Sequence, residues 1–340
     1  MLDFKEITKG IEFNPLTIRE DTPFTQSFIY GAWQEMAGHN VRRFEIKQGE
    51  EITGFFQVIT YSLPLSKNIL YIPHGPVLRQ GYKGQADFLK EFHKKLTEIS
   101  KEENVIFVRF DIFPKTEEVF SKVFKKIPGY AYHSFYFQPK FDWILDLNKK
   151  EEKLTGEMHP KTKYNINLAT RKGVKVEIIK DNFEQYFEDF YRLMEETAKR
   201  DHFNLHQKIY YQNIFQTLNP NNAFLAVARY DDTILLVNLI LLYGKTAYFI
   251  FGGSSDNLKN LMFSHLAQWE SIREAKRLAF DFYNFGGVGH HSSYETYGGI
   301  SVFKKRFGGE IFEHSDSYDI VLNQFWYYLY NIRKWLLNLT

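Results

Sequence analysis

The sequence predicts an α/β protein of two similar domains, in each of which a mixed β-sheet is flanked by helices. Two observations lead to this prediction. The chain has 340 residues, of which 44% are hydrophobic, and a single hydrophobic core usually stops growing below this length. The same order of strands and helices is also expected twice along the chain. Two unrelated α/β lobes with a similar order remain the alternative.

The first half of the chain is expected to fold as three strands, a helix and a further strand. β-Branched and aromatic runs bounded by turn residues predict the strands Arg43–Lys47, Ile52–Ser62, Ile69–Ile72 and Val105–Phe110. Apolar residues at helical spacing predict a helix over Gln85–Glu103.

The second half repeats this order. Strands are expected at Phe224–Tyr230, Ile234–Tyr243, Ala247–Phe251 and, after a helix over Leu258–Arg277, at Phe280–Phe285. A duplicated unit is therefore inferred, and units of this type suggest the acetyltransferase-like (GNAT-like) fold.

The boundary between the halves is expected near Asn148–Glu152. There the predicted strand Phe141–Leu147 runs into NKKEEKLTGEMHP, a polar stretch without apolar periodicity. Helices are expected at Lys161–Lys172 and Phe183–Lys199. The tail, Tyr318–Leu339, is expected to be a helix with large apolar residues on nearly all sides. Such a helix docks against a lobe or lies on a membrane surface.

Composition excludes several classes of site. The absence of Cys excludes disulfides, iron–sulfur clusters and thiol nucleophiles. Lys plus Arg (43) nearly balance Asp plus Glu (41), so only local basic patches are available to a polyanion. The charged opening MLDFKEITKGIEF and the absence of a long apolar run predict a cytoplasmic protein. Dinucleotide, P-loop and coenzyme A phosphate motifs are missing, and neither a cofactor nor a metal is expected.

Several segments resemble the Fem family of peptidoglycan aminoacyltransferases. In chain order they are TQSFIYGAW, YIPHGPVL, MHPKTKYNINLATRKGVKV, ETAKRDHF, FIFGGSS, QWESIREAKRLAFDFYNFGGV and GGISVFKKRFGGE. The resemblance implies two acetyltransferase-like domains, 1–148 with 318–340 and 149–317, because the last segment returns to complete the first. Only a short segment follows ETAKRDHF, so a compact form without the helical-hairpin arm is expected.

The resemblance implies transfer of an amino acid from aminoacyl-tRNA to the side-chain amine of a peptidoglycan stem peptide. The acceptor would be UDP-MurNAc-pentapeptide or lipid II, with peripheral contact to the inner membrane surface. An ester is already activated, so neither a metal nor an enzyme nucleophile is needed. The alternatives are an N-acyltransferase with another acyl donor and a non-catalytic protein that binds tRNA or the wall precursor.

The catalytic candidates are Lys304, Phe303 and Asp111. GGISVFKKRFGG is expected to be a strand, which would direct Lys304 and Arg306 to one face and Phe303 and Lys305 to the other. The match to the family pattern F-K-x-x-F-G-G implies that Lys304 would steady the leaving oxygen or the oxyanion and that Phe303 would shape the site. Arg306 ranks second as a phosphate contact, and Lys305 is expected to be dispensable. Asp111, at a predicted strand end, orients or deprotonates the incoming ammonium, or caps a loop.

Further positions are candidates for substrate binding. Arg200 ends a predicted helix and matches the family's ligand for the precursor phosphates, although a last-turn cation also suits the helix dipole. A basic run is a candidate surface for the tRNA acceptor stem, or a solvated face. An aromatic and glycine group would line the substrate cleft. The basic run contains Lys161, Lys163 and Arg171, and the second group contains Tyr248, Phe251, Gly252 and Gly253.

The chain also departs from the family pattern. The Lys expected shortly after Trp33 is absent, since Gln34 to Ala37 follow, and Arg42 or Arg43 is the candidate substitute for its charge. His74 stands where Arg is usual. Asn284 stands where an Asp precedes the Phe-Gly-Gly motif. These changes leave open whether the acceptor is nucleotide-linked or lipid-linked.

Overall fold

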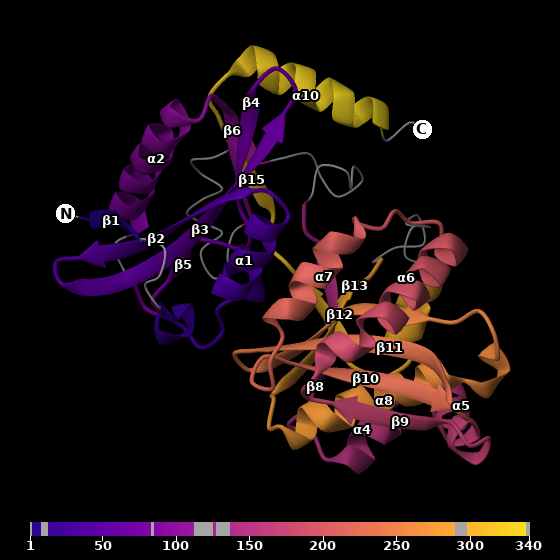
Figure 1. The fold of residues 1–340 in the computed structure, drawn as a ribbon. Helices are drawn as coiled ribbons and strands as arrows, with labels where there is room; N and C mark the ends of the chain where they lie inside the picture. Colours follow the sequence, from indigo (N-terminus) through magenta and orange to yellow (C-terminus); the bar gives the residue numbers. More distant parts are fainter. Residues whose placement is uncertain are drawn as a thin grey trace. The chain divides into compact units, whose positions relative to one another are not determined.

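The computed structural model describes residues 2–7, 13–82, 85–111, 125–126, 137–289 and 298–337. Two compact units make up the chain (Figure 1). The first combines Met1–Lys140 with His314–Thr340, and the second is Phe141–Glu313. Pro114, three residues after the candidate Asp111, and the His290-His291 pair, which follows the Phe-Gly-Gly motif, lie outside the described residues.

The first unit contains a sheet with the strand order β1-β2-β3-β4-β6-β15-β7, and β5 pairs with β3. Its strands are β1 (Leu2–Glu6), β2 (Asn40–Gln48), β3 (Glu51–Leu63), β4 (Lys67–Ile72), β5 (Val77–Leu78), β6 (Val105–Asp111), β7 (Lys125–Lys126) and β15 (Ser317–Val321). Its helices are α1 (Phe28–Met36), α2 (Gln85–Glu102) and α10 (Gln324–Leu337), with short 3-10 turns at Pro15–Thr17 and Phe24–Gln26.

Helix α2 covers one face of this sheet because its apolar residues recur every three or four positions. Phe88, Phe92 and Leu96 are almost fully buried against strands β2, β3, β4 and β6. Strand residues whose side chains point to the other face of the sheet, among them Phe55 and Phe107, pack against α1 and α10. The sheet is therefore buried on both faces.

The second unit contains a sheet with the order β14-β8-β13-β12-β11-β10-β9. Its strands are β8 (Phe141–Asp146), β9 (Lys175–Ile179), β10 (Ala223–Tyr230), β11 (Thr233–Tyr243), β12 (Thr246–Ser254), β13 (Phe282–Gly287) and β14 (Glu310–Glu313). Its helices are α4 (Glu151–Glu157), α5 (Pro160–Arg171), α6 (Phe187–Asp201), α7 (Lys208–Thr217), α8 (Phe263–Arg277) and α9 (Gly298–Lys305), with 3-10 turns at Phe183–Tyr186 and Lys259–Leu261.

Helices α8 and α6 lie on opposite faces of the second sheet (Figure 1). The α8 face carries the main core, in which α4 and α5 also bury apolar residues. Between α6 and β10, where every residue is described, the chain forms only the ten-residue α7. No helical-hairpin arm is present in that segment, as expected.

The two sheets have the same pairing. In each, three antiparallel strands are followed by a helix and then by a strand parallel to the third: β2-β3-β4, α2 and β6 in the first unit, and β10-β11-β12, α8 and β13 in the second. The parallel strand then pairs antiparallel with β15 in the first unit and with β8 in the second. The predicted fold, two mixed sheets flanked by helices in tandem, is confirmed.

One strand has been exchanged between the units. β8 comes before the core strands of the second unit, whereas β15, in the corresponding place of the first sheet, is the last strand of the chain. The expected boundary at residue 148 lies beyond β8, but β8 belongs to the second unit because it pairs with β13 and β14. The expected return at residue 318 similarly falls inside β15, which starts at Ser317.

Local expectations differ from the structure in three places. The tail is a helix only from Gln324, because Ser317–Val321 pairs with β6 as β15. The polar stretch after β8 contains α4, whose Leu154 is fully buried. The helix expected from Leu258 begins at Phe263, since Leu258 and Met262 have left-handed backbones. No helix in the described part of the chain is long and apolar enough to cross a membrane.

Candidate functional site

The segment Gly298–Lys305 is the helix α9, not the expected strand. The β-branched residues Ile300 and Val302 favour a strand locally, but both are about half exposed. Burial instead follows helical spacing, since Ser301 and Lys304 face inward. The helical period separates the three cations, so that only Lys304 is buried.

Lys304 is a buried cation at the end of α9. Its side chain is 7% exposed, and its Nζ donates a hydrogen bond of 2.7 Å to the carbonyl oxygen of Gly287 in β13. Burial lowers the pKa of Lys304 to about 8, against the opposing attraction of Asp142. A lysine with this pKa is mostly protonated near neutral pH and can also release its proton.

Two glycines fix the end of α9 against β8. Gly308 and Gly309 both have positive φ angles, which L side chains rarely adopt. A Cβ atom on Gly309 would lie 2.4 Å from the carbonyl oxygen of Ile144, so only glycine allows this approach. Trp143 Nε1 donates to the carbonyl oxygen of Gly308 at 2.7 Å. The Gly308-Gly309 pair therefore positions the end of α9 and, with it, Lys304.

The backbone that receives Lys304 is held by Asn284, a buried residue of β13. Its amide nitrogen donates to Asp142 of β8 at 2.9 Å, and its amide oxygen accepts from the Gly286 backbone N–H at 2.6 Å. The ladder between β13 and β8 is irregular between Asn284 and Gly287. In the sequence Asn284 stood out only as a departure from the family pattern, and its link to Asp142 carried no sequence signal.

Lys305 and Arg306, the two cations that follow Lys304, have different surroundings. Lys305 donates to the carbonyl oxygen of Gly289 at 2.9 Å and lies over the Trp143 ring. Arg306 lies near His265, where its charge, Lys161 and above all burial lower the pKa of the imidazole to about 4. His265 is therefore neutral near pH 7, and Arg306 and Lys161 form a positive surface beside it.

A pocket of about 320 Å³ opens in the second unit at the start of α8. Its walls include Arg200, Ser254, Lys259, Met262, His265 and Phe303. Phe303 packs edge-on against the rings of His265 and Phe307, each with a centroid distance of 5.2 Å. The structure thus brings two of the predicted residues, Phe303 and Arg200, to one pocket.

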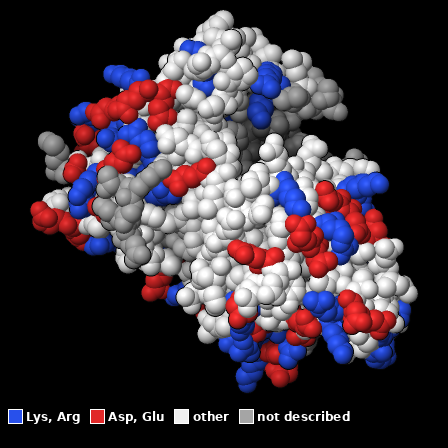
Figure 2. All heavy atoms as spheres, viewed as in Figure 1, with Lys and Arg blue, Asp and Glu red and all other residues white. Residues whose placement is uncertain are grey.

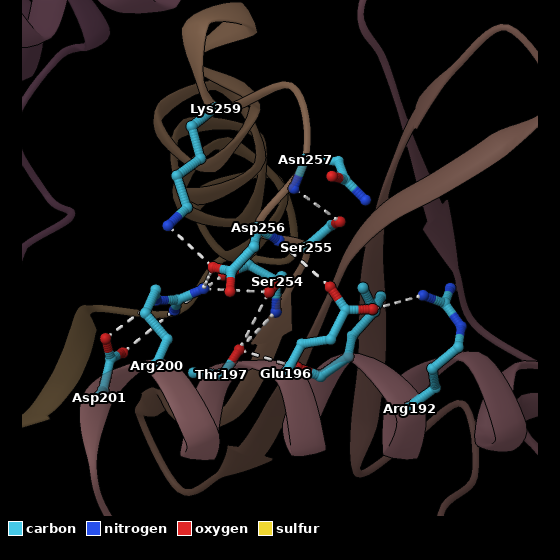
Figure 3. A network of polar contacts seen from close by, with 11 residues as sticks. Arg192, Glu196, Thr197, Arg200, Asp201, Ser254, Ser255, Asp256, Asn257 and Lys259 are labelled. Carbon is cyan, nitrogen blue, oxygen red and sulfur yellow. Dashed lines mark hydrogen bonds and ion pairs between the residues drawn. The ribbon is translucent and has the colours of Figure 1, made fainter.

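Arg200 ends α6 with its guanidinium fully engaged by protein groups (Figure 3). Nε and Nη2 donate to the two carboxylate oxygens of Asp201, and Nη2 also donates to the Ser254 hydroxyl. Nη1 donates to Asp256 at 2.9 Å and to the Ser254 carbonyl at 3.2 Å. These bonds use all five donors of the guanidinium, so a phosphate must displace one of the present partners.

The cations of the predicted basic run, Lys161, Lys163 and Arg171, do not form one stripe. Lys161 and Lys163 lie two residues apart in α5 and therefore point to different sides of that helix, and Arg171 lies at its far end over the Tyr164 ring. Lys161 is grouped with Arg306 through His265, as described above.

The aromatic and glycine group in β12 is mainly engaged in packing. Phe251 contacts the Tyr211 ring of α7, with a centroid distance of 5.3 Å, and Tyr248 is partly buried. A Cβ on Gly253 would lie 2.6 Å from the Met194 backbone nitrogen, and one on Gly252 would meet the Asn238 side chain at the same distance. The space that these glycines leave is filled by α6 and β11, which corrects the expectation that it admits substrate.

Asp111 lies in the first unit, at the end of β6. It is 5% exposed and accepts hydrogen bonds from the hydroxyls of Tyr71 and Ser317. Burial raises the pKa of Asp111, while the two hydrogen bonds oppose that rise.

The family departures in the first unit also have partners. His74 Nδ1 lies 2.9 Å from the Thr25 hydroxyl oxygen, and the His74 ring stacks on His314. Arg42 is paired with Glu6 and Glu102. Arg43 is paired with Glu35. Carboxylates bind both guanidinium groups, so a ligand would have to displace one of them, and the expectation that Arg42 or Arg43 replaces the absent Lys stays a prediction.

Comparison with known proteins identifies the family. The model of the FemAB family matches residues 129–233 and 228–334, more than half of the chain. The chain belongs to the FemAB family. This FemAB protein is 22% identical to the lipid II:glycine glycyltransferase of Staphylococcus saprophyticus, over 86% of the chain and 87% of the relative. A protein of the same name from Staphylococcus aureus is 21% identical, over 86% of each.

Solved structures agree on the fold. The crystal structure of FemX superposes on the FemAB protein with a TM-score of 0.79 at 18% identity, covering 96% of this chain and 99% of FemX. The C-terminal domain of a putative lysylphosphatidylglycerol synthetase from Agrobacterium fabrum has a TM-score of 0.59 at 13% identity and covers 90% of each chain. A tandem GNAT protein from the clavulanic acid pathway has a TM-score of 0.51 at 10% identity, covering 94% of this chain and 98% of its own. The predicted Fem resemblance and GNAT-like fold are confirmed.

Proposed function

We propose that this FemAB protein is an aminoacyltransferase that forms a peptide bond on a peptidoglycan precursor, with aminoacyl-tRNA as the donor. Lys304, a buried lysine whose pKa is lowered to about 8, is the observation on which this proposal chiefly rests. The names of the staphylococcal relatives, lipid II:glycine glycyltransferases, support a lipid-linked precursor as the acceptor.

The reaction is aminolysis of an ester. The acceptor amine attacks the ester carbonyl, a C–N bond forms, and the ribose oxygen leaves with the electrons of the C–O bond. The amine loses one proton, and the leaving oxygen gains one. Charge develops on the carbonyl oxygen and then on the leaving oxygen, and an ammonium in a buried site stabilises such charge more than it would in water.

Lys304 suits this step for two reasons. Below pH 8 it carries the positive charge that the oxyanion requires, and its lowered pKa eases proton transfer to the leaving oxygen. Its bond to the Gly287 carbonyl holds Nζ in place before substrate binds, so little reorganisation is needed in the reaction.

Three further groups are assigned to binding. Arg306 and Lys161, beside the neutral His265, would meet phosphates of the tRNA acceptor end. Arg200 would meet the precursor phosphates by exchanging Asp256, the partner that it shares with Lys259. Phe303 would shape the pocket that Arg200 and His265 also line.

Asp111 is proposed to orient the incoming ammonium. Asp111→Asn is then expected to lower turnover more than it weakens acceptor binding, with Ser317→Ala as a control that removes one of its hydrogen bonds. An unchanged turnover number in Asp111→Asn would remove this residue from the mechanism.

The direct test supplies the protein with a panel of radiolabelled aminoacyl-tRNAs and with lipid II or UDP-MurNAc-pentapeptide. Radiolabel is expected in the acceptor with one or a few of the aminoacyl-tRNAs. Acetyl coenzyme A serves as the competing donor, and transfer from it alone would favour the N-acyltransferase alternative. Transfer from no donor, together with retained tRNA binding, would favour a non-catalytic binding protein.

A further inference from the structure

We propose that the exposed face of α10 docks the first unit on an anionic phospholipid surface. The inference deepens the proposed function, because it rests on an acceptor that is linked to a membrane lipid. It concerns a helix that takes no part in the chemistry assigned above.

The opposite face of α10 anchors the helix to its own unit. Tyr327 is 3% exposed, contacts the Phe107 ring of β6 at a centroid distance of 5.2 Å and donates a hydrogen bond of 2.8 Å to Asp319. Trp326 and Tyr330 pack in the same cluster. These contacts hold α10 in place, so the fold does not depend on its outward residues.

The outward face of α10 is almost entirely apolar. Its members recur at helical spacing and form one continuous stripe, because they occupy positions i, i+3, i+4, i+7, i+10 and i+11. They are Phe325 (65% exposed), Tyr328 (65%), Leu329 (39%), Ile332 (36%), Trp335 (48%) and Leu336 (51%). Single exposed apolar residues are ordinary, but a contiguous stripe of six marks a binding surface.

Cations lie on α10 and beside it. α10 contains no Asp or Glu, and Arg333 and Lys334 lie in its last turns. Lys67, at the start of β4, lies over the Trp326 ring at 5.3 Å. Beside it, the β3–β4 turn exposes Leu65 by 73%. In Figure 2 the surface over α10, at the top of the view, is mostly white with a few blue groups.

This combination favours a membrane surface over a protein partner. Aromatic residues with a polar edge, here Tyr328 and Trp335, are typical of the level of the lipid headgroups. Large apolar residues between them enter the acyl boundary, and adjacent cations attract anionic lipids. Docking in this way would raise the local concentration of a lipid-linked acceptor.

The first test is flotation of the full-length protein with vesicles of phosphatidylcholine containing about one third phosphatidylglycerol, a composition chosen for surface charge. The double variant Phe325→Ser/Leu336→Ser removes two outward side chains. Its matched control, Ile209→Ser/Leu258→Ser, removes two exposed apolar side chains from the second unit (53% and 44% exposed). The α10 variant is expected to bind vesicles at least about tenfold more weakly than the control.

A charge test accompanies it. Arg333→Gln is expected to weaken binding about fivefold at low salt, with little effect in high salt. Thermal unfolding of each variant verifies that the fold is intact. Equal vesicle binding by the α10 variant and its control would overturn the proposal, as would binding to pure phosphatidylcholine that matches binding to the charged vesicles.

Three further outcomes would each distinguish one explanation from the others. A wild-type dimer that becomes monomeric in the α10 variant, without vesicle binding by either, would overturn the proposal and assign the stripe to a second copy. Flotation requires neither tRNA nor acceptor, so a protein that floats but transfers nothing contradicts only the proposed function. A protein that modifies the nucleotide-linked acceptor in solution but does not float contradicts only the docking proposal.

Discussion

The two units have the same strand pairing but differ in the group that binds a buried aspartate. In the first, Arg109 of β6 is fully buried and forms two hydrogen bonds with Asp319 of β15, at 2.8 and 2.7 Å. In the second, the equivalent strand β13 places the neutral Asn284 against Asp142 of β8. The buried aspartate thus binds a cation in the first sheet and a neutral amide in the second.

This difference bears on where chemistry can occur. A guanidinium bound by a carboxylate in a core has its charge neutralised and serves structure. In the second unit the negative charge of Asp142 instead acts on Lys304, where it opposes the effect of burial. The two units share one pairing pattern, and the second contains a buried cation whose charge is only partly compensated. The variants below test this contrast, from the largest expected effect to the smallest.

The largest effect is expected for Lys304→Met. Loss of the buried ammonium should lower the transfer rate about 10²- to 10³-fold, because the charge of the oxyanion is no longer balanced. Lys305→Met, which removes the neighbouring cation, is the matched control and should change the rate only slightly. Single-turnover transfer to the acceptor measures both, and equal losses would refute the distinction between the two lysines.

Arg109→Met tests the first unit. It leaves Asp319 buried without its cation and should lower the free energy of unfolding by about 3–5 kcal/mol. Asn284→Ala, the counterpart in the second unit, removes a neutral donor and should cost about 1–2 kcal/mol. Urea unfolding of the two variants compares the units, and a larger loss for Asn284→Ala would reverse the proposed contrast.

The pKa of Lys304 predicts a pH dependence. Its charge is present below about pH 8 and is lost as the pH rises through that value, so kcat/KM should fall above pH 8. The folded pKa lies below the ordinary value of 10.5, so burial of the charge costs stability below pH 8, and stability rises between the two values. Lys304→Met should lack this rise, which unfolding at pH 7 and pH 10 would reveal.

The smallest effect is expected at Arg200. Arg200→Lys keeps the charge but loses the planar fork, and should weaken binding of the phosphate-bearing acceptor about tenfold. Asp256→Asn frees one guanidinium donor from a charged partner and should tighten binding a few-fold. Calorimetric titration with the nucleotide-linked acceptor measures both. Opposite signs are required, and weakening in both variants would assign Arg200 to structure alone.

Much of the fold could be predicted because local periodicity reports it directly. The helix over Gln85–Glu102 and the strands β3, β4, β6, β10 and β11 were expected within a few residues, since apolar spacing and turn residues bound them. Ser317–Val321 was missed because its apolar residues run on into those of α10, and pairing with β6 is a long-range interaction. The exchange of β8 and β15 could not be predicted from a short stretch of sequence either, because it also depends on long-range strand pairing.

The candidate site could be derived from the sequence only in part, and its roles stay predictions. Lys304 and Phe303 were identified from a motif, although the expected strand is a helix, because β-branched residues indicate local preference and not burial. The roles of Asn284 and Gly309 could not be predicted, since each depends on β8, more than a hundred residues earlier in the chain. Gly252 and Gly253 were expected to admit substrate, but the chain itself occupies that space.

The sequence by itself determined the duplicated order of elements, the absence of cysteine chemistry and the resemblance to the Fem family, because these depend on residue type and spacing. Only the tertiary structure decided which of the three neighbouring cations is buried, and with it the lowered pKa of Lys304. It also decided that one face of α10 is anchored and the other is exposed. Burial and electrostatic environment arise from residues distant in the chain, and these meet only when it folds.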